Sequence, residues 1–206
     1  MFNIALPKGR LAEKVAKILA QIGFDTSFLN DDNRKLVFSD TKNQISYFLV
    51  KPSDVAIYVE RGVADIGVVG KDILLEDRAD VYELMDLNIG KCRMVVAAKN
   101  NFRENKERPL KVATKFVNIA SEYYSSLNRD IEIIKLNGSI ELAPILNMSD
   151  VIVDIVETGT TLKENNMKVI AEIMPISARL IANKTSYKFK KDIIDDLIGK
   201  LREVIK

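Results

Sequence analysis

Residues 151–162, Val-Ile-Val-Asp-Ile-Val-Glu-Thr-Gly-Thr-Thr-Leu, contain the strongest structural signal in this sequence. The six residues 151–156 are β-branched and apolar except for Asp154, which is typical of a buried parallel strand. A turn over 157–161 and a short helical segment ending near 165–166 are expected to follow. A strand, a turn and a helix in this order predict an α/β fold with a parallel sheet.

The turn after this strand has the composition of a phosphate site. It contains Thr158, Gly159, Thr160 and Thr161. The glycine allows the backbone to approach a ligand closely, while hydroxyl groups and the N–H groups of a helix N-terminus donate hydrogen bonds to a phosphate. Asp154 and Glu157 would repel a phosphate, but carboxylates bind ribose hydroxyls or a magnesium ion beside them. The stretch therefore indicates a ribose 5-phosphate, with an ordinary turn capped by Thr160 as the alternative.

The composition excludes several kinds of chemistry. There are no histidines among the 206 residues, so histidine acid–base catalysis and histidine metal ligands are excluded. The single cysteine, Cys92, excludes an internal disulfide and a cysteine-rich zinc site. It suits a reducing compartment, and we expect a buried, inert thiol. A net charge of +2 gives no general reason to expect nucleic acid as a partner.

Length and hydrophobicity are those of an ordinary globular protein. Hydrophobic residues make up 47% of the sequence, which is enough for a core. The length suits one large domain or two small ones. We find neither a secretory leader at the N-terminus nor an apolar run as long as a membrane span.

The order of the predicted elements indicates two α/β lobes. In the first half, strands are predicted over 2–6, 36–38, 45–50, 64–69 and 81–87, and helices are predicted to start at Arg10, near Ser53 or Asp54, and at 70–72. A strand over 92–98 and a polar segment over 99–109 follow. The second half then shows strands over 110–113, 131–136 and 150–156 and helices over 116–127 and 139–147.

The last part of the sequence contains two further signals. Residues 167–182 are apolar, but Pro175 argues against one central strand, so two strands or a crossing between lobes is expected. Apolar residues then recur at helical spacing, which predicts one amphipathic C-terminal helix. They are Phe189, Ile193, Leu197, Leu201 and Val204. We therefore predict lobe I over 1–90 and 178–206, lobe II with the phosphate turn over 91–177, and a ligand cleft between them.

A positive cluster is predicted at the start of the first helix. Lys8 and Arg10 flank Gly9 at the junction between a strand and a helix. Cations at a helix N-terminus oppose the helix dipole, so two of them there favour an anion bound at the same place. The alternative is that both side chains simply extend into water.

Four stretches match the signatures of one protein family, in the family's order. They are 5–11 (Ala-Leu-Pro-Lys-Gly-Arg-Leu), 54–74 (from Asp-Val-Ala-Ile-Tyr to Gly-Lys-Asp-Ile-Leu), 136–144 (Leu-Asn-Gly-Ser-Ile-Glu-Leu-Ala-Pro) and 151–162. On these motifs the sequence resembles ATP phosphoribosyltransferases over nearly its whole length. It resembles their short form, which lacks a C-terminal histidine-sensing domain, so we expect histidine alone to have little effect on the isolated chain.

The resemblance implies an activity, a fold and partners. The reaction is the transfer of the phosphoribosyl group of phosphoribosyl pyrophosphate to N1 of ATP, a pentosyl transfer that begins histidine biosynthesis. The fold implied is that of the type II periplasmic binding proteins. The resemblance also implies substrate-bound Mg²⁺, a cytoplasmic location, and a homodimer that assembles with a catalytically inactive regulatory subunit resembling histidyl-tRNA synthetase.

The resemblance assigns roles to the candidate residues as well. It implies that residues 158–161 bind the 5-phosphate of the donor. Asp154 and Glu157 would bind its ribose or the metal ion. It also implies that a set of basic and neighbouring residues binds pyrophosphate and the ATP phosphates. Arg10 and Arg34 are the catalytic members of this set. The set comprises Lys8, Gly9, Arg10, Arg34, Lys51 and, near the ATP, Glu141. No metal ligands of the protein's own are assigned.

Two positions depart from the family pattern. Lys51 stands where many members have arginine, which removes a bidentate contact to phosphate. Pro7 stands where some members have serine, which removes a hydroxyl donor. From spacing alone, Arg34 and Lys51 would be interpreted as solvated surface charges, and only the resemblance places them in a site.

Two other functions are consistent with parts of the pattern. A non-catalytic two-lobed sensor would bind one anionic metabolite without magnesium, because fold does not determine function. Another phosphoribosyltransferase with a different acceptor would share the turn over 157–161, since that turn resembles the wider donor-binding pattern.

Overall fold

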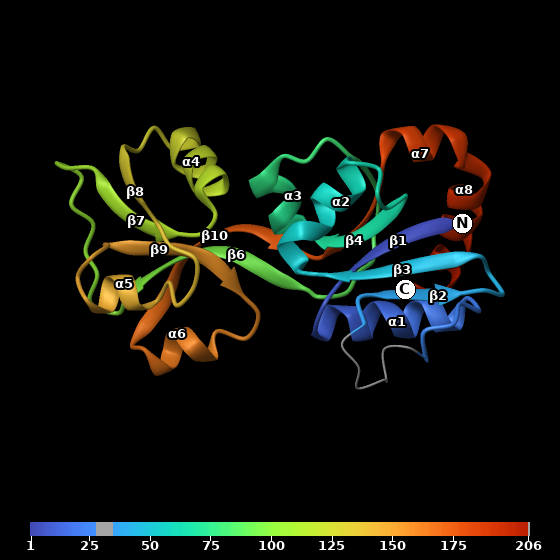
Figure 1. Ribbon diagram of the computed structural model, residues 1–206. Coiled ribbons are helices and arrows are strands. Elements are labelled where there is room, and N and C mark those ends of the chain that lie inside the picture. Colours follow the sequence, from blue (N-terminus) through green and yellow to red (C-terminus); the bar gives the residue numbers. More distant parts are fainter. Residues whose placement is uncertain (28–34, 206) are drawn as a thin grey trace. The chain divides into compact units, whose positions relative to one another are not determined.

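The structure is a computed structural model that describes residues 1–27 and 35–205 (Figure 1). The chain divides into two compact units. Unit 1 consists of Met1–Leu74, Arg78–Gly90 and Ser177–Lys206, and unit 2 consists of Leu75–Asp77 and Lys91–Ile176. Each unit contains one mixed β-sheet with helices on its faces.

The sheet of unit 1 has the strand order β2-β3-β1-β4-β11-β5. Its strands are β1 (Phe2–Pro7), β2 (Val37–Asp40), β3 (Ile45–Val50), β4 (Ile66–Gly70), β5 (Tyr82–Asp86) and β11 (Ala178–Ala182). The central strands β3, β1 and β4 are parallel, and the strands on either side of them are antiparallel. The strands predicted over 2–6, 45–50 and 64–69 are confirmed within two residues.

The helices that accompany this sheet are α1 (Arg10–Gln21), the 3-10 helix η2 (Pro52–Asp54), α2 (Val55–Glu60), α3 (Lys71–Asp77), α7 (Lys184–Phe189) and α8 (Lys191–Val204). The helices α1, α2 and α8 bury apolar residues. Leu19 of α1 and Leu201 of α8 pack in one core with Leu6 of β1. On the other face, Val55 and Val59 of α2 pack in a separate cluster.

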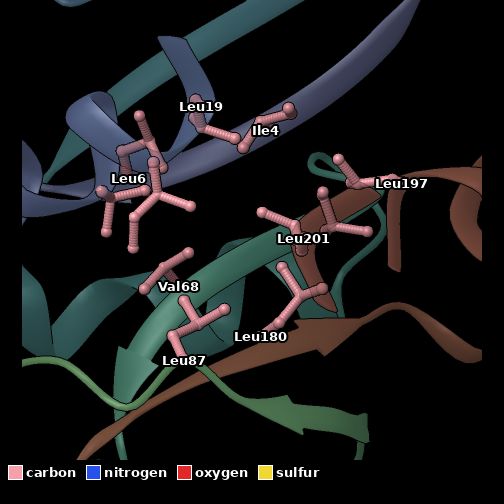
Figure 2. Close-up of a pocket in the computed structure, with 11 residues that line it drawn as sticks. Ile4, Leu6, Leu19, Val68, Leu87, Leu180, Leu197 and Leu201 are labelled. Carbon is pink, nitrogen blue, oxygen red and sulfur yellow. The ribbon is translucent and has the colours of Figure 1, made fainter. Parts of the chain in front are cut away.

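The core beneath α1 and α8 contains a small cavity of about 10 Å³ (Figure 2). Eleven side chains line it, and all of them are aliphatic, including Ile4, Val68 and Leu180. A space of this volume holds about one water at most, and an apolar lining keeps it dry. It is a packing defect of the core and has neither the room nor the polar groups for a phosphorylated substrate.

The C-terminal segment differs from the single helix that we predicted. It forms α7 and α8, which meet at Lys190, and the ammonium of Lys190 lies 2.7 Å from the buried carboxylate of Asp65. Phe189 ends α7 and is 77% exposed, and Ile193 is 55% exposed. The predicted apolar stripe is therefore wrong at these two positions, because the backbone leaves helical geometry at Lys190 and the buried face of α8 is made by Ile194, Leu197, Ile198 and Leu201.

The sheet of unit 2 has the strand order β10-β6-β9-β7-β8. Its strands are β6 (Cys92–Lys99), β7 (Leu110–Thr114), β8 (Ile131–Lys135), β9 (Val151–Val156) and β10 (Met167–Ile176). The strands β9, β7 and β8 are parallel, and β6 and β10 are antiparallel to their neighbours. Pro175 lies in β10, at the edge of the sheet, where a missing N–H is tolerated. Cys92 is half-buried against the core of unit 2, rather than buried as we predicted.

The helices of unit 2 lie on opposite faces of its sheet (Figure 1). The helix α4 (Val117–Ser126) covers one face, and the short helices α5 (Leu142–Ile145) and α6 (Thr160–Glu164) cover the other. The helix predicted over 139–147 is wrong at both ends. Ser139 and Asn147 adopt left-handed backbone angles, with φ of 48° and 59°, which an α-helix does not accommodate. Within the described ranges no helix is long and apolar enough to cross a membrane.

Candidate active site

The basic candidates of unit 1 lie at the carboxyl edge of its parallel strands. Pro7 of β1 is paired with Val50 of β3, and the backbone N–H of Lys8 donates to the carbonyl oxygen of Val50 at 2.8 Å. Lys8 and Lys51 thus leave neighbouring strands at the same edge, and Arg10 starts α1 beside them. All three side chains are exposed, and none has an ion pair with a described carboxylate.

Gly9 makes the turn that brings Lys8 and Arg10 to this edge. Its backbone has φ 89° and ψ −160°, a region that is essentially restricted to glycine. It is the N-cap of α1, and no side chain caps the helix there. Two uncompensated cations therefore accompany uncapped N–H groups, as an anion site requires.

Lys71 lies at the same sheet edge, but an ion pair compensates its charge. It follows β4, which is parallel to β1, and its ammonium lies 2.5 Å from a carboxylate oxygen of Glu83. Because Glu83 compensates its charge, Lys71 offers less to an incoming anion than Lys8, Arg10 and Lys51. Arg34, the other predicted catalytic residue, lies outside the described residues.

In unit 2, three parallel strands end at the same edge of the sheet, and a loop follows each of them there. Thr114 at the end of β7 is paired with Lys135 of β8 and with Val153 of β9. The segments that follow are 115–116, 136–141 and 157–161. The register therefore places Glu141 and the phosphate turn at the same edge of the sheet, as ligand sites in open α/β sheets require.

The phosphate turn has a defined local geometry. Gly159 adopts a left-handed conformation with φ 80° and is the N-cap of α6. The hydroxyl oxygens of Thr158 and Thr160 are 3.0 Å apart, and the backbone N–H of Thr160 donates weakly to the hydroxyl oxygen of Thr158 at 3.4 Å. The alternative with Thr160 as the cap is thus not what the structure contains. Thr158, Thr160 and Thr161 are exposed, so a ligand can reach their hydroxyl groups.

The two carboxylates of this loop differ in their surroundings. Asp154 is half-buried in β9, and one of its carboxylate oxygens accepts from the N–H of Ile155 at 2.8 Å. Glu157 is exposed at the start of the turn. No group of three or more candidate metal ligands occurs among the described residues. Two carboxylates suit a magnesium ion that its substrate mainly holds.

An ion pair at the opposite end of β9 supports the strand that carries the turn. The guanidinium of Arg108 donates to both carboxylate oxygens of Asp150, each at 2.7 Å, and the N–H of Lys111 donates to one of them at 2.9 Å. These hydrogen bonds, with that from Arg108 the largest cause, lower the pKa of Asp150 below its usual value. Asp150 thereby anchors the start of β9 to the segment 108–111.

Sequence reasoning singled out Glu141 but missed the conformation of the loop around it. Glu141 is half-buried and directly precedes α5, and Ile140 before it is 2% exposed. Ser139 has φ 48°, which is uncommon for a residue other than glycine, asparagine or aspartate. No sequence pattern signals that serine, because the strain depends on how the loop connects β8 to α5.

Comparison with known proteins gives consistent results. The family model described as HisG, ATP phosphoribosyltransferase, matches residues 51–203. The chain is 63% identical over 206 residues to the ATP phosphoribosyltransferase of Brachyspira hyodysenteriae, with 100% of both chains covered. A solved ATP phosphoribosyl transferase (HisG:HisZ) complex from Thermotoga maritima has a TM-score of 0.85 and 39% identity, covering 100% of this chain and 98% of that one.

A more distant likeness concerns the fold alone. The periplasmic aliphatic sulphonate binding protein SsuA from Escherichia coli has a TM-score of 0.60 at 13% identity, covering 98% of this chain and 71% of that one. The predicted likeness to periplasmic binding proteins is thereby confirmed. The signatures, the family model and the full-length identity agree, and the chain belongs to the ATP phosphoribosyltransferase family.

Proposed function

We propose that this protein transfers the phosphoribosyl group of phosphoribosyl pyrophosphate to N1 of ATP, with phosphoribosyl-ATP and pyrophosphate as products. This is the first step of histidine biosynthesis. The observation that carries the proposal is the turn over 157–161 at the carboxyl edge of unit 2, in a chain of this family.

Unit 2 is the lobe that binds the donor. The 5-phosphate accepts hydrogen bonds from the hydroxyl groups of Thr158, Thr160 and Thr161 and from backbone N–H groups beside Gly159. Asp154 and Glu157 face the ribose hydroxyls, which are hydrogen-bond donors and suit carboxylates. The exposure of the three threonines and the left-handed Gly159 support this assignment.

The cations of unit 1 neutralise the phosphates. Adenine N1 carries a lone pair and needs no base before it attacks, so the absence of histidine is no obstacle. The reaction requires alignment of N1 with the anomeric carbon and stabilisation of the departing pyrophosphate. Arg10 and Arg34 supply this stabilisation at the leaving group. Lys8 and Lys51, with the backbone of Gly9, bind pyrophosphate or ATP phosphates as point charges.

Magnesium enters with the substrates. Phosphate oxygens of the donor and of ATP carry Mg²⁺, whose charge reduces the repulsion between the two polyphosphates. Asp154 and Glu157 are the described residues of the site that fit such an ion, because hard cations prefer carboxylate oxygens.

The proposal extends to assembly and location. The Thermotoga maritima relative was solved as a HisG:HisZ complex, and this supports assembly of the present chain with a second, regulatory subunit. The proposal takes that subunit to resemble histidyl-tRNA synthetase and the present chain to form a homodimer. A biosynthetic enzyme that uses ATP is proposed to be cytoplasmic.

One assay separates this function from its rivals. Near-UV absorbance is followed after ATP, phosphoribosyl pyrophosphate and Mg²⁺ are mixed with the protein, and a rise that requires all three is expected. A phosphoribosyltransferase with another acceptor would show no change with ATP but would release pyrophosphate with that acceptor. A sensor would bind one ligand and release no pyrophosphate at all.

A further inference from the structure

One buried residue of unit 2 connects the three parallel strands near their carboxyl ends. Thr114 is the last residue of β7, which lies between β8 and β9 in the sheet. Its exposed fraction is 0%, and it is the only buried threonine among the described residues. Because a buried hydroxyl group costs free energy unless it is hydrogen-bonded, its partners show what the side chain holds in place.

The hydroxyl group of Thr114 makes two hydrogen bonds. It donates to the carbonyl oxygen of Val153 on β9 at 2.7 Å, and it accepts from the backbone N–H of Phe116 at 2.8 Å. The first bond reaches β9 at the last residue pair of the two strands, Thr114 with Val153. The second bond closes the turn that leads from β7 into α4. The hydroxyl group thus sets both the end of β7 and its distance from β9.

The backbone of Thr114 holds the third strand. Its carbonyl oxygen accepts from the N–H of Leu136 at 3.0 Å, where the segment 136–141 leaves β8. The three loops of the carboxyl edge therefore follow strands that a single residue connects. The connections to β9 and to the segment 115–116 depend on the hydroxyl group, whereas the connection to the segment 136–141 does not.

The hydrogen bond to Val153 bears directly on Asp154. A peptide group is planar, so a bond that fixes the carbonyl oxygen of Val153 also fixes the N–H of Asp154 in the same plane. Asp154 is proposed to face the ribose of the donor, and the turn over 157–161 begins three residues after it. Side chains that bind a ligand need a backbone that neighbouring groups hold in position.

We propose that Thr114 is a positioning residue for the phosphoribosyl donor, whose hydroxyl group fixes the end of β9 so that Asp154 and the turn over 157–161 can bind the donor. This inference rests on the proposed function. Thr114 is fully buried and acts through these residues, without contact to a substrate. The segment with Glu141, which is assigned to ATP, is held by the carbonyl oxygen of Thr114, and a change of side chain leaves that oxygen in place. The two substrates should therefore respond differently to loss of the hydroxyl group.

The test uses two pairs of side chains at position 114 that differ in the hydroxyl group, each in the full-length protein. Thr114→Val replaces the hydroxyl group by a methyl group of similar size. Thr114→Ser keeps the hydroxyl group and loses the methyl group, and Thr114→Ala differs from Thr114→Ser by one oxygen atom. Pyrophosphate release gives kcat and the KM for each substrate, and calorimetric titration gives the Kd for phosphoribosyl pyrophosphate.

Donor binding should follow the hydroxyl group rather than the stability of the variant. Thr114→Val and Thr114→Ala should raise Kd and KM for phosphoribosyl pyrophosphate about 10-fold or more, the typical effect of removing a partner that orients ligand-binding groups, and should change KM for ATP less than about threefold. Thr114→Ser should keep the donor affinity within about threefold of that of the unmodified protein, although the loss of a buried methyl group lowers its Tm.

A variant in the core of the same strand is the matched control. Val112 lies two residues earlier on β7 and is 0% exposed, and its side chain carries no hydrogen-bonding group. Val112→Ala should lower Tm by about 5 °C because it leaves a cavity, and it should leave KM for both substrates unchanged. It separates an effect of lower stability from an effect of the lost hydroxyl group.

Each outcome decides the inference. Normal donor affinity without the hydroxyl group would overturn it, and so would an equal rise of KM for both substrates. It would also fail if Thr114→Ser or Val112→Ala lost donor affinity as Thr114→Val does, because binding would then follow stability. If neither Thr114→Val nor Thr114→Ala folds, the hydroxyl group serves folding itself, and the inference is wrong.

Failure of the proposed function is a separate result. An unmodified protein that neither binds phosphoribosyl pyrophosphate nor releases pyrophosphate with ATP would refute that function, and this inference with it. If the unmodified protein binds the donor and is active, each of the contrary results for the variants refutes the inference about Thr114 alone.

Discussion

In unit 1, the segment after β1 presents the cations of Lys8 and Arg10, whereas in unit 2 the segment after β9 presents hydroxyl groups, a glycine and the carboxylate of Glu157, and no cation. Both segments join a parallel strand to a helix at the carboxyl edge of a sheet. The chemical difference matches what each is proposed to bind. A 5-phosphate keeps its charge during the reaction and needs well-placed donors, while a departing pyrophosphate gains charge and needs cations.

The two junctions also differ in their glycines. Gly9 has φ 89° and ψ −160°, and Gly159 has φ 80° and ψ 5°. The second conformation is the ordinary left-handed region, which other residues reach with moderate strain, while the first is essentially limited to glycine. Backbone geometry is thus more demanding at the cationic junction than at the hydroxyl junction.

The largest expected effect is on turnover at the cationic junction. Arg10→Ala should lower kcat by about 10²- to 10³-fold, the typical loss when one donor to a developing charge is removed. Stability should stay the same or rise slightly, because a cation is removed from a helix N-terminus. Arg61→Ala, at another exposed arginine of unit 1, is the matched control and should keep full turnover. A normal kcat in the Arg10→Ala variant would show that other residues stabilise the departing pyrophosphate.

A smaller effect is expected at the hydroxyl junction, and on binding. Thr160→Val retains the volume and removes the hydroxyl group, so affinity for phosphoribosyl pyrophosphate should fall by about 1.5–3 kcal/mol. Calorimetric titration measures this loss, with Thr41→Val in the exposed β2–β3 turn as the control. If Thr160→Val binds phosphoribosyl pyrophosphate with unchanged affinity, the turn does not bind the 5-phosphate as proposed.

The glycines provide a test on stability. Gly9→Ala should destabilise the protein by about 2–3 kcal/mol and Gly159→Ala by about 1 kcal/mol, because only the second conformation is accessible to alanine. Space does not limit either change. A methyl group on Gly9 would meet no atom within 4 Å, and one on Gly159 would meet only Val156, at 3.7 Å. Equal losses in urea unfolding would contradict the backbone explanation.

The smallest effect concerns the strand that supports the hydroxyl junction. The pKa of Asp150 is lowered by its hydrogen bonds with Arg108, so its contribution to stability is present above the pKa of the unfolded state and is lost as pH falls through the folded value. Asp150→Asn should lower Tm by about 2–4 °C at pH 7. The two proteins should converge as the pH falls through the lowered pKa of Asp150, since the unmodified carboxyl is then protonated as well. If the difference in Tm persists at acid pH, altered packing rather than the lost charge of Asp150 explains it.

Much of the fold could be predicted because its signals are local. The β-branched run of β9, the glycine after it and the alternation of strands with helices depend on near neighbours in the chain. The same is true of the turn over 157–161, whose chemistry is carried by consecutive residues. The remaining site residues are predictions from the resemblance to the family, and Arg34 among them lies beyond the described ranges.

The sequence by itself thus determined most element types, the α/β class and the turn over 157–161 between a strand and a helix. The tertiary structure alone decided which charges are compensated and where elements end. The C-terminal helix is interrupted at Lys190, which pairs with the distant Asp65. Glu83 compensates Lys71, but no described carboxylate compensates Lys8. Each of these outcomes depends on groups far apart in the chain, whose proximity arises from strand register and packing rather than from local pattern.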